Sequence, residues 1–130
     1  MPNPSEQMLA DALAAQKFTR KFFVVELDFT EATIAVLEAQ CEAAKYALRA
    51  GLNSENIDKL TTLWGAYFGE VLRRHSAGQW DLVQAGDADR LALQANGTTV
   101  FPHDSIRQRL EQGPAANLSQ AYEALKSRLQ

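Results

Sequence analysis

The stretch SENIDKLTTLWGAYFGEVLRR, residues 54–74, has the clearest helical pattern in this sequence of 130 residues. Its large apolar side chains recur every three or four residues, which places them along one side of an α-helix. They are Ile57, Leu60, Leu63, Trp64, Tyr67, Phe68, Val71 and Leu72. At about 100° per residue they cover roughly half of the helix circumference. The pattern predicts a central helix, with Ala66 and Arg73 among the residues on its opposite side.

Gly65 and Gly69 lie one turn apart at the flank of this apolar arc. Glycine inside a helix costs about 1 kcal/mol relative to alanine, so the pair predicts that another backbone passes close by. The preceding helix, expected to run to about Arg49, is rich in alanine and therefore slim. We expect that helix to pack against the glycine flank, after the short turn at residues 51–54.

Before this helix pair, the hydrophobic pattern changes from the period of a helix to the period of a strand. Ser5 is expected to cap a first helix that reaches about Phe18. Phe23, Val25, Leu27 and Phe29 then alternate with Val24, Glu26 and Asp28, which is typical of an extended or strand segment. Asp28 or Thr30 can cap the alanine-rich helix, because Asp28 and Glu31 have the spacing of a capping box.

Residues 79–101 have the period of a sheet. Trp80 and Leu82 alternate with Asp81 and Val83, and residues 85–89 (AGDAD) predict a polar turn. The pair Asn96-Gly97 is a strong hairpin signal, because both residues tolerate positive φ. We expect a three-stranded antiparallel meander of residues 79–84, 90–95 and 98–101. A two-residue turn at Asn96-Gly97 would pair Ala95 with Thr98, Leu93 with Val100, and Leu91 with Pro102.

Two short helices are expected at the C-terminal end. Asp104 or Ser105 can cap the first, which Gly113-Pro114 would stop, and Asn117 can cap the second. The sequence therefore predicts an α+β fold of helices packed on a small three-stranded antiparallel meander, in the order α-(β)-α-α-β-β-β-α-α. We expect one domain over residues 1–130, with a helix within residues 1–20 that can lie at its periphery.

Composition narrows the classes of function. The net charge of −3 argues against broad nucleic-acid binding, which favours a basic surface. No apolar run is long enough to cross a membrane, and the first residues lack the pattern of a signal peptide. A single cysteine, Cys41, favours a reducing compartment, so we expect a cytoplasmic protein. Cys41 lies in an apolar stripe, which favours core packing over reactivity.

Glu70 is the most informative polar residue, because it borders the apolar arc of the central helix. A partly buried carboxylate there could act as an acid or a base. Arg73 and Arg74 follow at i+3 and i+4, the spacing of intrahelical ion pairs, which favours a structural role. Arg107 is a further expected partner. Tyr67, Glu70, Arg73 and Arg74 are the residues we expect at a binding site, if the central helix contributes to one.

His75 and His103 follow the central helix and the third strand. Loop residues near element ends often carry function, so both are weak catalytic candidates beside Glu70. Two histidines with Asp104 could bind a metal, yet no spacing in the sequence brings them together. We therefore expect no metal and no cofactor. Several arginines could gather as an anion- or nucleic-acid-binding patch, but the net negative charge and nearby acidic residues favour a solvated face of ion pairs; these arginines are Arg73, Arg74, Arg107 and Arg109.

Several stretches resemble a family of small bacterial domains of unknown function. They are LDFTEATIAVLEAQ (27–40), GAYFGEVLRR (65–74), Trp80, VFP (100–102) and IRQRLEQG (106–113). The resemblance covers Leu27 to the C-terminus and is most specific at Gly65, Tyr67, Gly69 and Glu70. Thr33 and His103 depart from it, where a serine and a less polar residue are expected. The resemblance implies a bacterial, cytoplasmic α+β domain and implies no activity.

These patterns favour a non-catalytic binding or protein-interaction module, similar in kind to immunity or adaptor proteins. No motif with a strong catalytic mechanism is present. The alternative is a small enzyme with a pocket around Glu70, Tyr67 and a histidine. It requires Glu70 and a histidine in one open cleft, with no arginine dedicated to the carboxylate. The sequence leaves the partner and the oligomeric state open.

Overall fold

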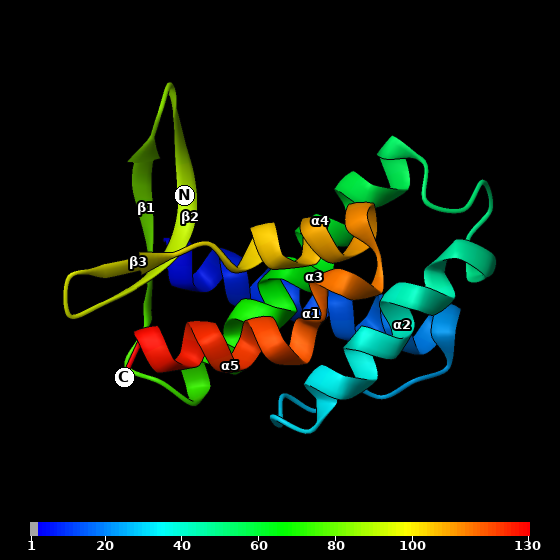
Figure 1. Cartoon of the computed structure of the whole chain (residues 1–130), viewed down its shortest axis with the longest axis horizontal. Helices are drawn as coiled ribbons and strands as arrows, with labels where there is room; N and C mark the ends of the chain where they lie inside the picture. Colours follow the sequence, from blue (N-terminus) through cyan, green and yellow to red (C-terminus); the bar gives the residue numbers. More distant parts are fainter. Residues whose placement is uncertain (1–2) are drawn as a thin grey trace.

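The computed structural model describes residues 3–130 and has an α+β fold of five α-helices and one three-stranded sheet (Figure 1). The helices are α1 (Pro4–Phe23), α2 (Thr33–Ala47), α3 (Ser54–Arg74), α4 (Pro102–Gln112) and α5 (Leu118–Arg128). The strands are β1 (Gln79–Ala85), β2 (Ala88–Ala95) and β3 (Thr98–Val100), and a short 3-10 turn, η1 (Pro114–Ala116), precedes α5. The predicted fold class and element order are confirmed.

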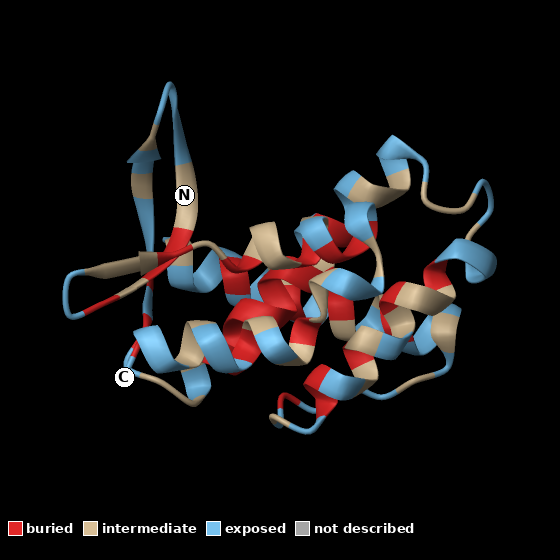
Figure 2. Cartoon of the chain, in the orientation of Figure 1, coloured by how far each residue is buried: buried red, intermediate tan, exposed pale blue. Residues whose placement is uncertain are grey.

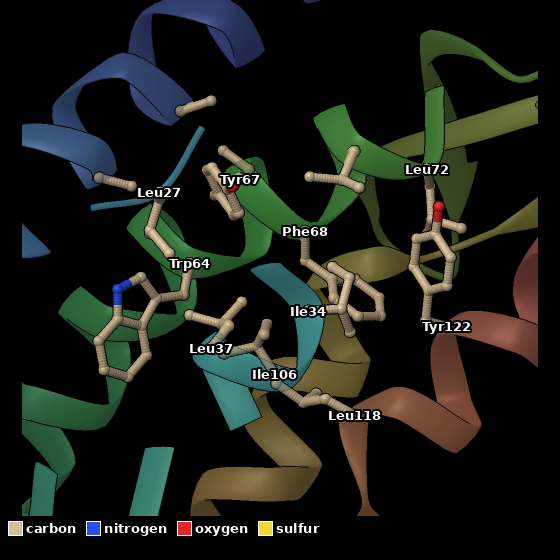
Figure 3. Packing of buried hydrophobic residues seen from close by; sticks show 14 of the residues in the cluster. Leu27, Ile34, Leu37, Trp64, Tyr67, Phe68, Leu72, Ile106, Leu118 and Tyr122 are labelled. Carbon is tan, nitrogen blue, oxygen red and sulfur yellow. The ribbon is translucent and has the colours of Figure 1, made fainter. Parts of the chain in front are cut away.

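Helix α3 has the predicted bounds and runs through the middle of the molecule. Asn53 caps it by accepting a hydrogen bond from the Asn56 amide (2.8 Å). Residues 64–72 are all buried, so Ala66, expected on the solvent side, lies in the core. The physical reason is that α1 packs along this side of α3. Figure 3 shows Trp64, Tyr67, Phe68 and Leu72 of α3 among the core side chains.

Helix α1 begins at Pro4 after the Asn3 cap, rather than after Ser5, and continues to Phe23. Residues 1–2 of the helix expected within 1–20 lie outside the described residues. Met8, Ala12, Ala15 and Thr19 of α1 are buried, so α1 is part of the core. The Thr19 hydroxyl accepts a hydrogen bond from the Trp64 indole (3.0 Å).

Residues 24–29 form an extended segment that pairs with no strand in the described part of the chain. Val24 ends α1 in the left-handed region (φ 55°). Side chains along the segment are alternately buried and exposed, as the sequence pattern indicates: Leu27 and Phe29 are buried, while Glu26 and Asp28 are exposed. The segment packs on the core with one side buried. Burial of its apolar side chains, rather than hydrogen bonds to a neighbouring strand, holds it in place.

The capping box expected at the start of α2 is wrong. Helix α2 begins only at Thr33 and has no side-chain cap. Asp28 instead accepts a hydrogen bond from the Thr30 amide (3.1 Å), which closes a turn ahead of the helix. Glu31 reaches α5, where it accepts hydrogen bonds from Tyr122 (2.5 Å) and Lys126 (2.6 Å).

The glycine flank of α3 has a different neighbour from the one expected. Helix α2 lies at the end of the molecule opposite the sheet (Figure 1) and packs mainly on α5. A Cβ placed on Gly65 would lie 2.3 Å from His103 Cδ2, and one on Gly69 would lie 2.2 Å from Trp80 Cη2. The start of α4 and the first strand therefore pack on this flank. The rings of His103 and Trp80 fill the space that side chains at positions 65 and 69 would occupy.

The sheet has the order β1-β2-β3, with antiparallel pairing throughout. The predicted register at Asn96-Gly97 is confirmed for Ala95 with Thr98 and for Leu93 with Val100. The predicted pair of Leu91 with Pro102 is wrong, because Pro102 already begins α4. The first turn is tighter than expected and contains only Gly86-Asp87 between the paired residues Ala85 and Ala88.

The C-terminal helices follow the prediction more closely. Pro102 opens α4, so neither Asp104 nor Ser105 caps it, while Gly113 ends it with φ 87°. Asn117 caps α5 by accepting a hydrogen bond from the Gln120 amide (3.1 Å). The buried Arg109 of α4, 2% exposed, donates to Glu38 of α2 (2.8 Å), and Glu38 also accepts from the Leu118 amide (2.9 Å). One carboxylate thus joins three helices.

Candidate functional site

Glu70 is enclosed between α3 and β1, with only 1% of its surface exposed. Its Oε2 accepts a hydrogen bond from the Trp80 indole nitrogen (2.8 Å) and another from Arg73 Nε (2.7 Å). Its Oε1 accepts from Arg73 Nη2 (3.3 Å), and Arg74 approaches to 4.0 Å. Both carboxylate oxygens are therefore occupied, and Arg73 is a dedicated partner. Arg107, also expected near Glu70, pairs instead with Asp58 (2.8 Å).

Tyr67 points to another part of the core. Its hydroxyl oxygen accepts a hydrogen bond from the Phe29 amide (2.9 Å) and shares one with the Thr33 hydroxyl (2.6 Å). The Phe29 ring lies 4.8 Å from the Tyr67 ring, and the Arg74 guanidinium lies 4.1 Å from the centre of the Phe29 ring. Burial raises the pKa of Tyr67. These contacts hold the segment before α2 against α3.

The two histidines lie apart in the fold. His75 follows α3, and its Nδ1 hydrogen-bonds with the Val71 carbonyl (2.8 Å). The His103 ring rests on Gly65 and lies 6.1 Å from the Trp80 ring. Burial lowers the pKa of His103 to about 4, and the nearby Asp104 carboxylate opposes this shift only in part. Within residues 3–130, no hydrogen bond is made by the His103 ring.

His103 lines a surface cleft of about 260 Å³ at the base of the β1–β2 hairpin. We call it the hairpin cleft, and its lining residues are Met8, Asp11, Thr62, Arg90, Leu91 and His103. Two of its charged groups already have partners, because Arg90 pairs with Asp104 and Asp11 accepts a hydrogen bond from Gln7 (2.9 Å). The cleft thus combines the apolar side chains of Met8 and Leu91 with an imidazole whose pKa is lowered by burial.

The residues expected to form one pocket are thus divided among three places. Glu70 and Arg73 line a second depression of about 250 Å³, together with Ser5, Glu6 and Leu9 of α1. Tyr67 belongs to the core, and His103 lines the hairpin cleft on the other side of Trp80. Over residues 3–130, no three His, Cys, Asp or Glu side chains gather as metal ligands would.

Sequence reasoning missed most of the hairpin cleft. Met8 and Asp11 come from α1, Thr62 from α3, and Arg90 and Leu91 from β2. No short motif connects these residues, since the cleft exists only after four elements have packed. The sequence singled out only His103 of these six residues, as the histidine that follows the third strand.

His103 provides a pH prediction. The pKa of its imidazole, about 4 in the fold, lies below the ordinary value of 6.5. Between these values the unfolded chain binds more protons, so the free energy of unfolding rises with pH. This contribution is complete above pH 6.5 and is lost as the pH falls towards 4.

Urea denaturation at about pH 7 and about pH 4.5 measures this effect in the wild type and in His103→Gln. The wild type should lose more stability over this interval than the variant, which lacks the titrating ring. Equal losses in the two proteins would show that the imidazole of His103 titrates normally.

No helix among residues 3–130 has the length and apolar character required to cross a bilayer. No curated protein is significantly similar to this chain in sequence. A crystal structure of a protein from Bacteroides thetaiotaomicron VPI-5482 superposes with a TM-score of 0.72, at 13% identity, over 94% of this chain. The similarity shows a shared fold, and this chain spans only 43% of that protein.

A family model described as "Domain of unknown function (DUF3806)" matches residues 41–122. The match includes the glycine-containing part of α3, Trp80 and the start of α4, and it leaves out the stretch at 27–40. The expectation of a small family of unknown function is therefore confirmed, while the individual motifs remain predictions. The chain belongs to the DUF3806 family of domains of unknown function.

Proposed function

We propose that this chain is a non-catalytic protein-interaction module of the adaptor or immunity kind, and that it binds its partner at the β1–β2 hairpin. The observation that carries the proposal is Leu82, an apolar side chain 51% exposed on a hairpin that projects beyond the helices (Figures 1 and 2). Leu82 pairs across the sheet with Leu91, which lines the hairpin cleft, so the exposed leucine lies next to a concave surface.

The geometry of the expected catalytic groups supports this reading. Glu70 has no free carboxylate oxygen for a substrate, because both oxygens already accept hydrogen bonds from Trp80 and Arg73. Tyr67 is fully buried and holds the segment before α2. We therefore assign Tyr67, Glu70, Arg73 and Arg74 to the structure of the domain rather than to its binding surface. The enzyme alternative needs Glu70 and a histidine in one cleft, and they line different ones.

The hairpin is well placed for recognition. Leu82 and Leu91 stand opposite each other on one face of the sheet, and Leu91 also lines the hairpin cleft. A partner that covers Leu82 can extend over this face towards the unpaired His103 ring. Burial of such an apolar side chain is worth about 1.5–3 kcal/mol, so a few contacts of this kind support specific binding.

Site-specific photo-crosslinking in the producing cells tests the proposal. A photoreactive residue replaces Leu82 in one variant, and Tyr46 in a matched control. Tyr46 is 85% exposed on α2, at the end of the molecule away from the sheet. We expect a discrete protein adduct from position 82 and none from position 46. No adduct from position 82, or the same adducts from both positions, would contradict the proposed surface.

A further inference from the structure

Strand β1 is an open edge of the sheet, because the strand order is β1-β2-β3 and, among residues 3–130, β2 is its only neighbour strand. It is seven residues long, and among its residues only Trp80 is buried. The outer part of the hairpin is exposed or half-buried in Figure 2. Natural proteins usually shorten, cover or charge such an edge, because its free backbone groups can pair with another strand.

The register defines which backbone groups are free. Ala85 and Ala88 flank the two-residue turn, and such a flanking pair exchanges backbone hydrogen bonds. The alternation of an antiparallel pair then directs the backbone groups of Val83 and Asp81 towards β2. The N–H and C=O groups of Leu82 and Gln84 point outward.

The Leu82 amide confirms this orientation independently. It donates a hydrogen bond to Oδ1 of the neighbouring Asp81 side chain (2.8 Å), which a ladder amide would not do. The contact is exposed and local, so rotation of one side chain releases the amide. Asp81 therefore covers the edge in the free protein and can be displaced by an incoming carbonyl.

The hairpin around this edge is acidic. Asp81, Asp87 and Asp89 are exposed, and none of them forms an ion pair within residues 3–130. The single basic residue of the hairpin, Arg90, is neutralised by Asp104 of α4. Three uncompensated carboxylates on one projecting hairpin favour a basic partner, because opposite charges on neighbouring strands stabilise pairing.

From these observations we infer that β1 accepts an extended, lysine- or arginine-rich segment of a partner protein by strand addition, an inference that rests on the proposed interaction function. Backbone hydrogen bonds to Leu82 and Gln84 supply register, and alternate side chains of the segment contact Leu82 on one face. The basic side chains of the segment lie on the opposite face, beside Asp81, while Asp87 in the turn and Asp89 on β2 add to the negative charge around the edge.

Charge also distinguishes this occupant from a second copy of the chain. Pairing of two β1 edges would bring two acidic hairpins together, and like charges on adjacent strands are destabilising. A basic segment is attracted to the acidic hairpin, whereas a second copy of the chain is repelled by it. The pairing should weaken as salt is added, because the aspartates are exposed.

Titration of the full chain with a short synthetic peptide tests the inference, followed by amide NMR. The peptide alternates lysine with threonine, and its control alternates glutamate with threonine. We expect the lysine peptide to protect the Leu82 and Gln84 amides from hydrogen exchange and the glutamate peptide to leave them unchanged. Binding of both peptides equally, or of neither, would overturn the inference.

A proline variant separates strand addition from other modes of binding. Gln84→Pro removes an outward amide without removing a bond to β2, and proline is tolerated at such edge positions. It should weaken binding of the lysine peptide about tenfold, the effect of losing one hydrogen bond, whereas Gln84→Thr should bind like the wild type. Equal affinity of Gln84→Pro and Gln84→Thr would rule out strand addition.

A second measurement covers the case in which Gln84→Pro perturbs the hairpin. The lysine peptide methylated at its backbone nitrogens should not bind the wild type, because it cannot complete the ladder. Protection of Leu82 and Gln84 that rises with protein concentration alone would identify a second copy as the occupant. Crosslinking from position 82 detects a partner in any binding mode. A crosslink from position 82 together with no effect of Gln84→Pro would refute strand addition but not the proposed interaction function.

Discussion

Replacing Glu70 by alanine should lower the free energy of unfolding by about 3 kcal/mol, near the lower end of the range for breaking a buried ion pair. The Trp80 indole N–H would lose the carboxylate that accepts its hydrogen bond, in a site where Trp80 itself is buried. Arg73 would lose its partner, but its side chain is 32% exposed, and water would compensate part of that loss. Urea denaturation followed by tryptophan fluorescence measures the change.

Two further variants separate charge from packing. Glu70→Gln keeps an oxygen that can accept from Trp80 and loses the charge that Arg73 needs, so it should cost about 1–2 kcal/mol. Glu26→Ala is the matched control, because Glu26 pairs with Arg20 (2.6 Å) and both side chains are well exposed. It should change stability by at most about 1 kcal/mol. A cost for Glu70→Ala as small as that of Glu26→Ala would leave the carboxylate free for chemistry and would revive the enzyme alternative.

Local rules predicted the elements that depend on nearby residues. The apolar arc of residues 54–74 predicted the bounds of α3 correctly. The free energy gained by burying so many large apolar side chains exceeds the helix propensity lost at Gly65 and Gly69. Asn96 and Gly97 adopt φ of 52° and 80°, as the hairpin signal required. The pairing register followed from that turn by counting residues.

Long-range packing was beyond the same rules. Glycine at positions 65 and 69 predicted a close approach, yet not which neighbour makes it. A slim helix and two bulky rings both satisfy that requirement, and only the topology placed Trp80 and His103 there. Likewise, the spacing of Asp28 and Glu31 fits a capping box, but Glu31 gains more from Tyr122 and Lys126, which lie far away in the sequence.

The candidate site was predicted only in part for a related reason. The i+3 spacing correctly identified Arg73 as a partner of Glu70, while the indole of Trp80, ten positions away, escaped notice. A hydrogen bond between a helix and a strand leaves no periodic trace in the sequence. The binding surface proposed for the hairpin depends on the absence of neighbours around Leu82 and on an unpaired edge, which no pattern of residue types reveals.

Gly69→Ala should destabilise the protein by about 2 kcal/mol, although alanine is the better helix former by about 1 kcal/mol. A Cβ at this position would lie 2.2 Å from Cη2 and 2.3 Å from Cζ2 of Trp80, far inside van der Waals contact. The indole cannot simply move away, because its nitrogen is hydrogen-bonded to Glu70. The substitution should therefore disturb both the packing of Trp80 on α3 and its hydrogen bond to the Glu70 carboxylate.

A double-mutant cycle with Trp80→Phe identifies the cause of that loss. Phenylalanine lacks the six-membered ring portion of the indole that carries Cη2 and Cζ2, so Gly69→Ala should be nearly neutral in the Trp80→Phe background. Trp80→Phe alone should be destabilising, because it removes the donor to Glu70 and leaves a cavity. Urea denaturation of the four proteins gives a coupling energy, expected at about 2 kcal/mol. Additive effects would show that the glycine at position 69 is required for a reason other than the tryptophan packed against it.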